Sequence, residues 1–399
     1  MSDLLIKNVR PHGREPVDVL IQNGRIAKLE ANIVAKHSDE IIDGENQLLL
    51  PGLVNAHAHI DKNFIGLPWQ PNQVPGSRIK DYVDNERHMR RELNLSSETQ
   101  SARDIETEIA TGTTHIRTHV DLDTEFGIEH FEGVLATKEK YKGLMTLQTV
   151  AFPHSGMLIR PGTIELLEEA VKLGADCIGG LDPSTVDRDP AKHLDIVFDI
   201  ADRYGVEVDI HLHEPGRLGA FSVELIAERT RALGLQGKVT ISHVFCLGQV
   251  EAGYLNQLID LLLENQITIM SLGSGTAQFP PLKLLHDAGV PLCTGTDGVR
   301  DAWGPYNSTD LLNRVKMLGY RTGLRKDHDV EMLLRIATYG GAAVMKESNY
   351  GLEVGHQADL FVVAGDTPTE AVMVQPPRKV VVKNGRVVAR NGKFIGLPT

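Results

Sequence analysis

The stretch LLLPGLVNAHAHID, residues 48–61, decides the fold, because it is an apolar run that ends in two histidines. Seven more short runs of apolar and β-branched residues follow it: THIRTHVD (114–121), MTLQTVAF (145–152), CIGGLDP (177–183), EVDIHLHE (207–214), KVTISHVF (238–245), ITIMSLG (267–273) and VPLCTGTD (290–297). Segments with helical spacing separate most of these runs, such as TIELLEEAVKLGAD (163–176) and FSVELIAERTRALGL (221–235). Regular strand–helix alternation indicates parallel strands, and eight units favour an α/β fold with a closed (β/α)8 TIM-type barrel. An open doubly wound sheet is the alternative, but no GxGxxG motif follows the first strand.

The two ends of the chain carry similar hairpin signals. VDVLIQNGRIAKLEA (17–31) and KVVVKNGRVVARNG (379–392) each place alternating apolar residues around an Asn-Gly pair, and GLEVGHQADLFVV (351–363) indicates a turn and a strand. Asn-Gly is the strongest short hairpin signal, because both central residues must accept positive φ. We therefore expect residues 1–50 and 351–399 to form one small β-sandwich domain, with the barrel in residues 51–350.

The composition is that of a soluble globular protein, with 41% hydrophobic and 24% charged residues among 399. A net charge of −12 argues against nucleic acid or an anionic membrane as the main partner and leaves a small molecule as the expected one. The three cysteines are far apart and odd in number, and neither a signal peptide nor a membrane span is recognisable. These features predict a cytoplasmic protein, and a homo-oligomer stays open.

Polar residues close four of the predicted strands. The first strand ends in His57 and His59, which alternation points to the same side. The fifth ends at His211, the sixth at His243 and the eighth at Asp297. Barrel enzymes carry their active sites at the carboxyl ends of the strands, and imidazole and carboxylate ligands suit zinc or ferrous iron.

One strand-end histidine is more often structural than a metal ligand, and HxH occurs by chance. Chance is a poorer explanation when four strand ends carry such residues in one layer of the barrel. One strand ends in a pair of histidines, two end in single histidines and one ends in an aspartate. The sequence therefore predicts a metal site at the mouth of the barrel.

This order of residues resembles the amidohydrolase superfamily. The motifs HAHIDK, RTHVD, QTVAFPHSG, DIHLHEPG, TISHVF and TGTDGVRDAWGP are similar to those of its cytosine deaminase-like branch. GGLDPSTVDRD, the His-Leu-His-Glu run and TDGVRDAWGP are closer still to the N-isopropylammelide isopropyl amidohydrolase type of enzyme. The resemblance spans the whole chain and is more specific for the branch than for the substrate.

The resemblance implies one divalent metal ion, zinc or iron(II), held by His57, His59, His211 and Asp297. No lysine stands where two-metal members carry a bridging lysine, which favours a single ion. A metal lowers the pKa of water from about 16 to about 7, so hydroxide can attack the ring carbon at neutral pH. Asp297 and His243 are then expected to assist that attack, and Glu214 to protonate the leaving nitrogen as general acid.

Four further residues are candidate substrate contacts. His213 lies on the same side of its strand as His211, and His119 ends the second strand, so each contacts the substrate or supports the ligands. His154 stands where cytosine deaminases tend to carry glutamine, and a neutral histidine offers its donor and acceptor on different edges. Trp303 is suited to stacking on a planar ring, although core packing explains it equally well.

Gly298 is a second departure from the cytosine-specific pattern. Those members follow the metal aspartate with another aspartate, and glycine removes this carboxylate. Strict cytosine specificity is therefore not expected.

The function that the sequence favours is a hydrolase of carbon–nitrogen bonds other than peptide bonds. We expect it to deaminate a small nitrogen heterocycle, such as a pyrimidine or triazine, or to release an amine from it. A hydrolase that opens a cyclic amide is the first alternative. A catalytically silent binding scaffold is the second, although such chains usually lose the ligands or the acid that this sequence keeps.

Overall fold

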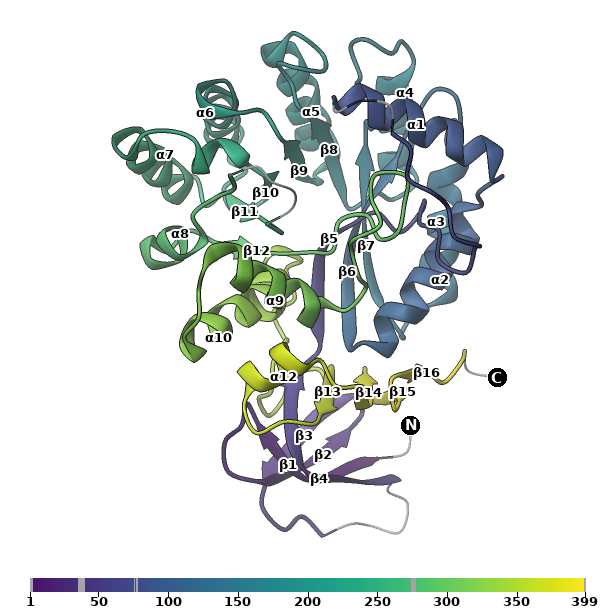
Figure 1. Ribbon diagram of the computed structural model, residues 1–399, viewed down its shortest axis with the longest axis vertical. Helices are drawn as coiled ribbons and strands as arrows, with labels where there is room; N and C mark the ends of the chain where they lie inside the picture. The colour runs from purple at the N-terminus through teal and green to yellow at the C-terminus, as the bar shows by residue number, and fades with distance from the viewer. Residues whose placement is uncertain (1–2, 35–39, 75, 77, 274–277, 398–399) are drawn as a thin grey trace.

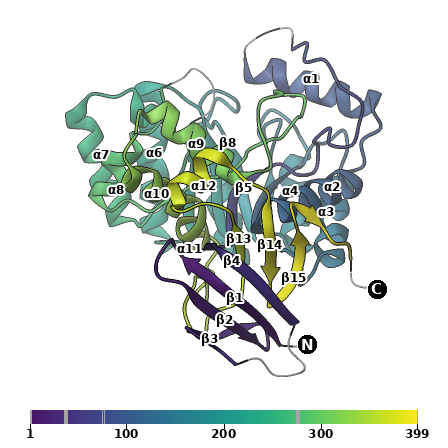
Figure 2. The same cartoon turned by 60° about the horizontal axis from the view of Figure 1, so that its bottom comes forward.

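The structure is a computed structural model that describes residues 3–34, 40–74, 76, 78–273 and 278–397 (Figure 1). A barrel surrounded by helices forms the larger part, and strands from both ends of the chain form a sheet at one side of it (Figures 1 and 2). No helix in the described part of the chain is long and apolar enough to span a membrane.

The barrel consists of eight parallel strands in sequence order, as predicted. They are β5 (Leu53–Ala58), β6 (Thr113–Asp121), β7 (Thr146–Phe152), β8 (Cys177–Leu181), β9 (Glu207–Leu212), β10 (Val239–His243), β11 (Thr268–Met270) and β12 (Leu292–Cys293). Each strand falls within one of the eight predicted runs, except that β6 begins one residue before its run, at Thr113. The first and last strands meet through two backbone hydrogen bonds, Ala56 N to Thr294 O (3.1 Å) and Asp297 N to His57 O (2.9 Å). The prediction of a TIM-type barrel is confirmed.

Helices connect the barrel strands and cover their outer side. They are α2 (Ser97–Ala110), α3 (Glu129–Lys140), α4 (Thr163–Lys172), α5 (Pro190–Tyr204), α6 (Gly216–Ala232), α7 (Ala252–Glu264), α8 (Leu282–Ala288), α9 (Leu311–Thr322), α10 (Asp327–Arg335) and α11 (Gly341–Val344). In α4, Leu167, Ala170 and Val171 are buried at the spacing of one helix face. This apolar face packs into the same hydrophobic core as the barrel strands.

Helix α1 (Ile79–Glu92) is an addition to the basic barrel that the sequence did not predict. It follows the long segment after β5, and Figure 2 shows it at the top of the molecule. Its buried residues are Val83, Glu86 and Arg90, so its inward face is mostly charged. The apolar period that reveals a helix is therefore weak here.

Strands from both ends form one mixed sheet, in the order β16-β15-β14-β13-β4-β1-β2-β3. They are β1 (Leu4–Pro11), β2 (Val17–Gln22), β3 (Arg25–Glu30), β4 (Glu40–Pro51), β13 (Leu360–Val363), β14 (Arg378–Lys383), β15 (Arg386–Arg390) and β16 (Lys393–Phe394), with helix α12 (Pro368–Val374) between β13 and β14. Some of the apolar side chains of these strands bury a core of their own, whereas others, such as Leu50, Phe361 and Val381, belong to the barrel core. Both Asn-Gly hairpins are confirmed, as is the strand within 351–363.

The two hairpin turns lie against each other at this core. Asn23, Gly24, Asn384 and Gly385 all have positive φ, between 51° and 77°. A Cβ on Gly385 would come within 2.6 Å of the Gly24 Cα, so only glycine fits this contact. The sheet thus curls until its two halves face each other, which gives the predicted β domain from both termini. The domain boundaries at residues 50 and 350 remain a prediction.

Candidate metal centre and active site

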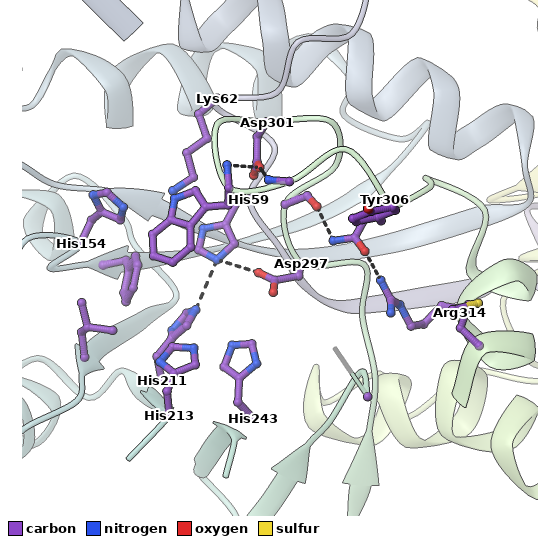
Figure 3. Close-up of a pocket in the computed structure, with 18 of the residues that line it drawn as sticks. His59, Lys62, His154, His211, His213, His243, Asp297, Asp301, Tyr306 and Arg314 are labelled. Atoms are coloured by element: carbon purple, nitrogen blue, oxygen red, sulfur yellow. Dashed lines mark hydrogen bonds and ion pairs between the residues drawn. The ribbon is translucent and has the colours of Figure 1, made fainter. Parts of the chain in front are cut away.

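Four of the predicted side chains lie close together at the mouth of the barrel, and Figure 3 shows three of them, His59, His211 and Asp297. His59 Nε2 lies 3.3 Å from His211 Nε2 and 3.4 Å from Asp297 Oδ1. His57 Nε2 lies 3.7 Å from the same carboxylate oxygen. Ligand atoms about 2.0–2.1 Å from a tetrahedral zinc ion lie about 3.3–3.4 Å from one another. These three distances are those expected between ligand atoms around a small cation.

Burial keeps the imidazoles of His59 and His211 neutral. It lowers the pKa of His59 well below its ordinary value, and Lys62 adds to this effect. Burial also lowers the pKa of His211 in the same way, with the neighbouring histidine His119 as the next cause. A neutral imidazole has a free lone pair on one ring nitrogen, which is the state that binds a metal. The cluster is thus ready to act as a ligand set at neutral pH.

The second nitrogen of His57 is oriented by residues behind the cluster. Ser242 Oγ donates a hydrogen bond to Asp209 Oδ1 (2.8 Å) and lies 3.1 Å from His57 Nδ1. Because the hydroxyl proton is already used, its oxygen accepts the Nδ1–H of His57, and Nε2 keeps its lone pair. His57 Nε2 is buried with no hydrogen-bond partner among the described residues. This unpaired nitrogen is the strongest local sign that a cation belongs here.

His213 and His243 form a stacked pair beside the cluster. Their ring centroids are 4.4 Å apart with an interplanar angle of 30°. Asp182 holds His213 through its backbone N–H (2.6 Å) and its Nδ1 (2.8 Å). Burial lowers the pKa of His213, but Asp182, with smaller effects of Asp297 and Glu214, raises it above its ordinary value. His243 has no hydrogen-bond partner at either ring nitrogen in the described part of the chain, so it can contact water or substrate.

A cavity of about 750 Å³ opens above the cluster. Three of the four predicted substrate contacts, His154, Trp303 and His213, line it, as do His243 and Asp297. The His154 and Trp303 rings lie 5.9 Å apart and nearly perpendicular. Its other walls come from strand ends, the segment after β12 and helix α9: His59, Lys62, Phe152, Leu181, His211, Gly273, Gly298, Asp301, Gly304, Tyr306, Asn307, Asn313, Arg314, Met317 and Arg321.

His119, the fourth predicted substrate contact, does not line the cavity. It is fully buried, and its Nε2 lies 3.4 Å from Asp209 Oδ1. Burial lowers its pKa to about 4, with His57 as the next cause. It joins His57, His59 and His211 in one group of four histidines whose ligand atoms lie within 4.8 Å of one another. Its position therefore does not favour a substrate contact, and its role beside the predicted ligands stays a prediction.

Glu214 is buried next to the cavity but is not part of its wall. Its Oε1 accepts hydrogen bonds from Ser184 N (2.7 Å) and Thr185 N (2.8 Å), and its Oε2 accepts one from Ser222 Oγ (2.7 Å). To reach a leaving nitrogen, the carboxylate has to turn away from these donors. Its predicted role as the general acid remains a prediction.

A charged network lies on one side of the cavity, and the sequence indicates only part of it, the charged pair Asp61 and Lys62 after the HxH motif. Lys62 Nζ lies 2.7 Å from Asp121 Oδ2 and 3.0 Å from Glu86 Oε2, and Trp303 Nε1 donates to Glu86 Oε2 (2.5 Å). Glu86 belongs to helix α1, so this helix fixes the indole at the cavity wall. Lys62 follows the HxH pair by three residues, which was a usable signal, whereas nothing in the sequence indicated Glu86.

Comparisons with known proteins show the family and the fold of the chain. The sequence model of the amidohydrolase family matches residues 40–389. The chain is 32% identical over 400 residues to N-isopropylammelide isopropyl amidohydrolase of Pseudomonas sp. (strain ADP), covering 98% of both chains. The crystal structure of N-isopropylammelide isopropylaminohydrolase from Burkholderia multivorans ATCC 17616 matches with a TM-score of 0.96 and 42% identity, over 99% of this chain and 100% of that one.

A more distant structure extends the likeness to the deaminases. The 5-methylcytosine deaminase from Klebsiella pneumoniae, liganded with 5-fluorocytosine, matches with a TM-score of 0.84 and 25% identity over 97% of each chain. The resemblance inferred from the motifs is confirmed by these matches. The chain belongs to the amidohydrolase family.

Proposed function

We propose that this protein is a mononuclear metal-dependent hydrolase that deaminates a small nitrogen heterocycle or releases an amine from it. The short distances that link His57, His59, His211 and Asp297 (3.3–3.7 Å), beside a cavity large enough for a substituted ring, carry the proposal. Relatives named for N-isopropylammelide and 5-methylcytosine support a pyrimidine or triazine as the ring.

The residues present fit one divalent cation, zinc or iron(II). Three imidazole nitrogens and one carboxylate oxygen are ligands that both metals accept. When bound, such a cation lowers the pKa of water to about 7 and so supplies hydroxide at neutral pH. Glu86, Asp121 and His154 form another group of possible ligands. The Lys62 ammonium forms ion pairs with both carboxylates of this group, so their negative charge is already balanced without a metal ion. The proposal is therefore a single metal ion.

Side chains of the protein would bind the ring and transfer the protons. Asp297 is both a ligand and a base that can accept a proton from water, and His243 stands beside it with two unpaired ring nitrogens. His154 and Trp303 would hold the ring against the cavity wall. Glu214 would deliver a proton to the leaving nitrogen after turning from Ser184 and Thr185.

A substrate panel on metal-reconstituted protein tests this function. The panel contains N-isopropylammelide, ammelide, cytosine, 5-methylcytosine, a pterin and a creatinine-like cyclic amide. We expect release of ammonia or an amine from a triazine or a pyrimidine, with little activity on cytosine. Formation of a new carboxylate without ammonia or amine would replace this proposal with ring opening. No turnover of any ring by fully metallated protein would favour a silent scaffold.

We also propose a cytoplasmic location. All three cysteines are unpaired and buried, which suits a reducing compartment. Cell fractionation with an antibody against the protein tests this, and recovery from an oxidising compartment would contradict it.

A further inference from the structure

We propose that Asp301 binds the substrate, with its Oδ2 accepting a hydrogen bond from an N–H group of the heterocycle. The inference rests on the proposed function and specifies which rings that site accepts. It supplies a carboxylate in place of the one that Gly298 removes from the cytosine-specific pattern.

The first argument is steric. A Cβ on Gly298 would lie 1.7 Å from Asp301 Oδ2, so the Asp301 carboxylate occupies the space of a side chain at position 298. Real Cβ atoms do not come closer than about 3.0 Å to a neighbour, so an aspartate at 298 and this placement of Asp301 exclude each other. Glycine at 298 thus lets a carboxylate from three residues further along reach the same position.

The second argument concerns hydrogen bonds. Asp301 Oδ1 accepts from Trp303 N (2.8 Å) and Gly304 N (3.2 Å), which fixes the carboxylate within its loop. Oδ2 has no hydrogen-bond donor among the residues that the structure describes. Asp301 is only 6% exposed and lines the cavity together with Asp297 and Trp303. A buried acceptor that faces a cavity and lacks a protein donor is suited to a donor on the ligand.

The charge around Asp301 agrees with that role. Burial raises the pKa of Asp301 to about 7, and Lys62 acts in the opposite direction. A hydrogen bond from a ring N–H would favour the ionised carboxylate and lower this pKa again. The site therefore gains most from a substrate that brings a donor.

This geometry selects a class of ring. Oxo-triazines and oxo-pyrimidines carry ring N–H groups next to their carbonyls, whereas the same rings methylated on nitrogen do not. A site built to bond a substrate N–H rejects the analogue that lacks it, because the buried protein group is then left unpaired. We infer that the substrate is a heterocycle with at least one free ring N–H.

A matched substrate pair tests the inference on the metal-loaded protein. The pair is N-isopropylammelide and its derivative methylated on a ring nitrogen. Loss of a hydrogen bond to a charged group should lower kcat/KM for the methylated ring by about 10- to 150-fold in the wild type. Asp301→Asn keeps an oxygen for Trp303 N and Gly304 N but replaces the free acceptor with a donor, so this preference should shrink to about threefold or less.

Two control variants show whether the effect belongs to the carboxylate. Asp287→Asn makes the same chemical change on exposed helix α8 and should leave the preference unchanged. The double variant Gly298→Asp/Asp301→Gly moves the carboxylate back to position 298 and should recover part of the preference. Gly298→Asp alone should instead weaken the preference of the wild type, because both carboxylates then compete for one space.

A binding measurement separates this inference from the proposed function. Cyanuric acid is the ring that remains when N-isopropylammelide loses its amine, and calorimetry measures its binding without turnover. If the wild type releases amine but Asp301→Asn changes neither the preference nor cyanuric acid binding, Asp301 is not a substrate contact. If the wild type releases no amine but binds cyanuric acid in an Asp301-dependent way, the proposed reaction fails and the contact stands. If it does neither, both are overturned.

Discussion

The substitution Asp104→Asn should stabilise the protein at neutral pH. Asp104 and Glu108 lie one turn apart on helix α2, both are buried, and Asn55 Nδ2 donates to Glu108 Oε1 (2.5 Å). Burial raises the pKa of Asp104 from 3.8 to about 8, and it also raises the pKa of Glu108 well above its ordinary value. Two adjacent carboxyls without a cation must therefore keep protons in the folded state that they release on unfolding.

The magnitude follows from linkage. Each unit of pKa difference is worth about 1.4 kcal/mol, so holding the Asp104 proton at pH 7 costs up to about 4 kcal/mol. Because the folded pKa lies above the unfolded one, this stability is fully present below about pH 4 and is lost as the pH rises towards 8. The asparagine side chain does not ionise, so the stability of the variant does not decrease in this way as the pH rises.

Urea unfolding of both proteins between pH 5 and pH 8 measures the effect. The difference in free energy of unfolding, variant minus wild type, should increase by about 3 kcal/mol between pH 5 and pH 7. Glu98→Gln, an exposed carboxylate on the same helix, serves as the control and should show almost no such gain. A stability difference that stays constant over this pH range would show that Asp104 is ionised in the folded protein.

Three further predictions concern the metal centre and its acid. Glu214→Gln should keep normal metal content but lose at least about 100-fold in kcat if Glu214 is the general acid, and wild-type turnover by this variant would refute that role. Ser242→Ala removes the partner of His57 Nδ1 and should weaken metal affinity by about 10- to 100-fold, measured by competition with a chelator. Full removal of the metal should abolish turnover and lower the free energy of unfolding by about 4 kcal/mol relative to protein with metal at 1,000 times its Kd. An unchanged melting temperature after chelation would contradict the proposed centre.

The barrel could be predicted from sequence because its strands are buried on both faces and stand between amphipathic helices. The run at 207–214 and the Asn-Gly pairs at 23–24 and 384–385 are local signals whose meaning does not depend on distant residues. Helix α1 could not be predicted in this way, because its buried face contains Glu86 and Arg90. Their burial is compensated by ion pairs with Lys62, Asp61 and Asp121, which only the folded chain brings near.

In the site, too, some residues follow from local sequence signals and others depend on contacts with distant parts of the chain. The positions of His57, His59 and His211 follow from strand alternation alone. The orientation of Glu214 does not, because it depends on N–H groups of the segment after β8, about 30 residues earlier in the chain. Asp301 was also missed, because its loop contains non-glycine residues with positive φ, Asp297 (61°) and Arg300 (46°), which sequence patterns seldom reveal.

The hydrogen bond from Asp297 N to His57 O bears on how the chain is made. It joins residues 240 positions apart, and strand β4 (Glu40–Pro51) likewise has to wait for its partner β13 (Leu360–Val363). During synthesis at about 5–20 residues per second, one edge of each of these early strands therefore stays unpaired for some tens of seconds, although β4 can already pair with β1 and β5 with β6. Long-range pairing of this kind slows folding and leaves strand edges open to other chains. We expect a nascent chain of this topology to need protection from aggregation until its last strands emerge from the ribosome.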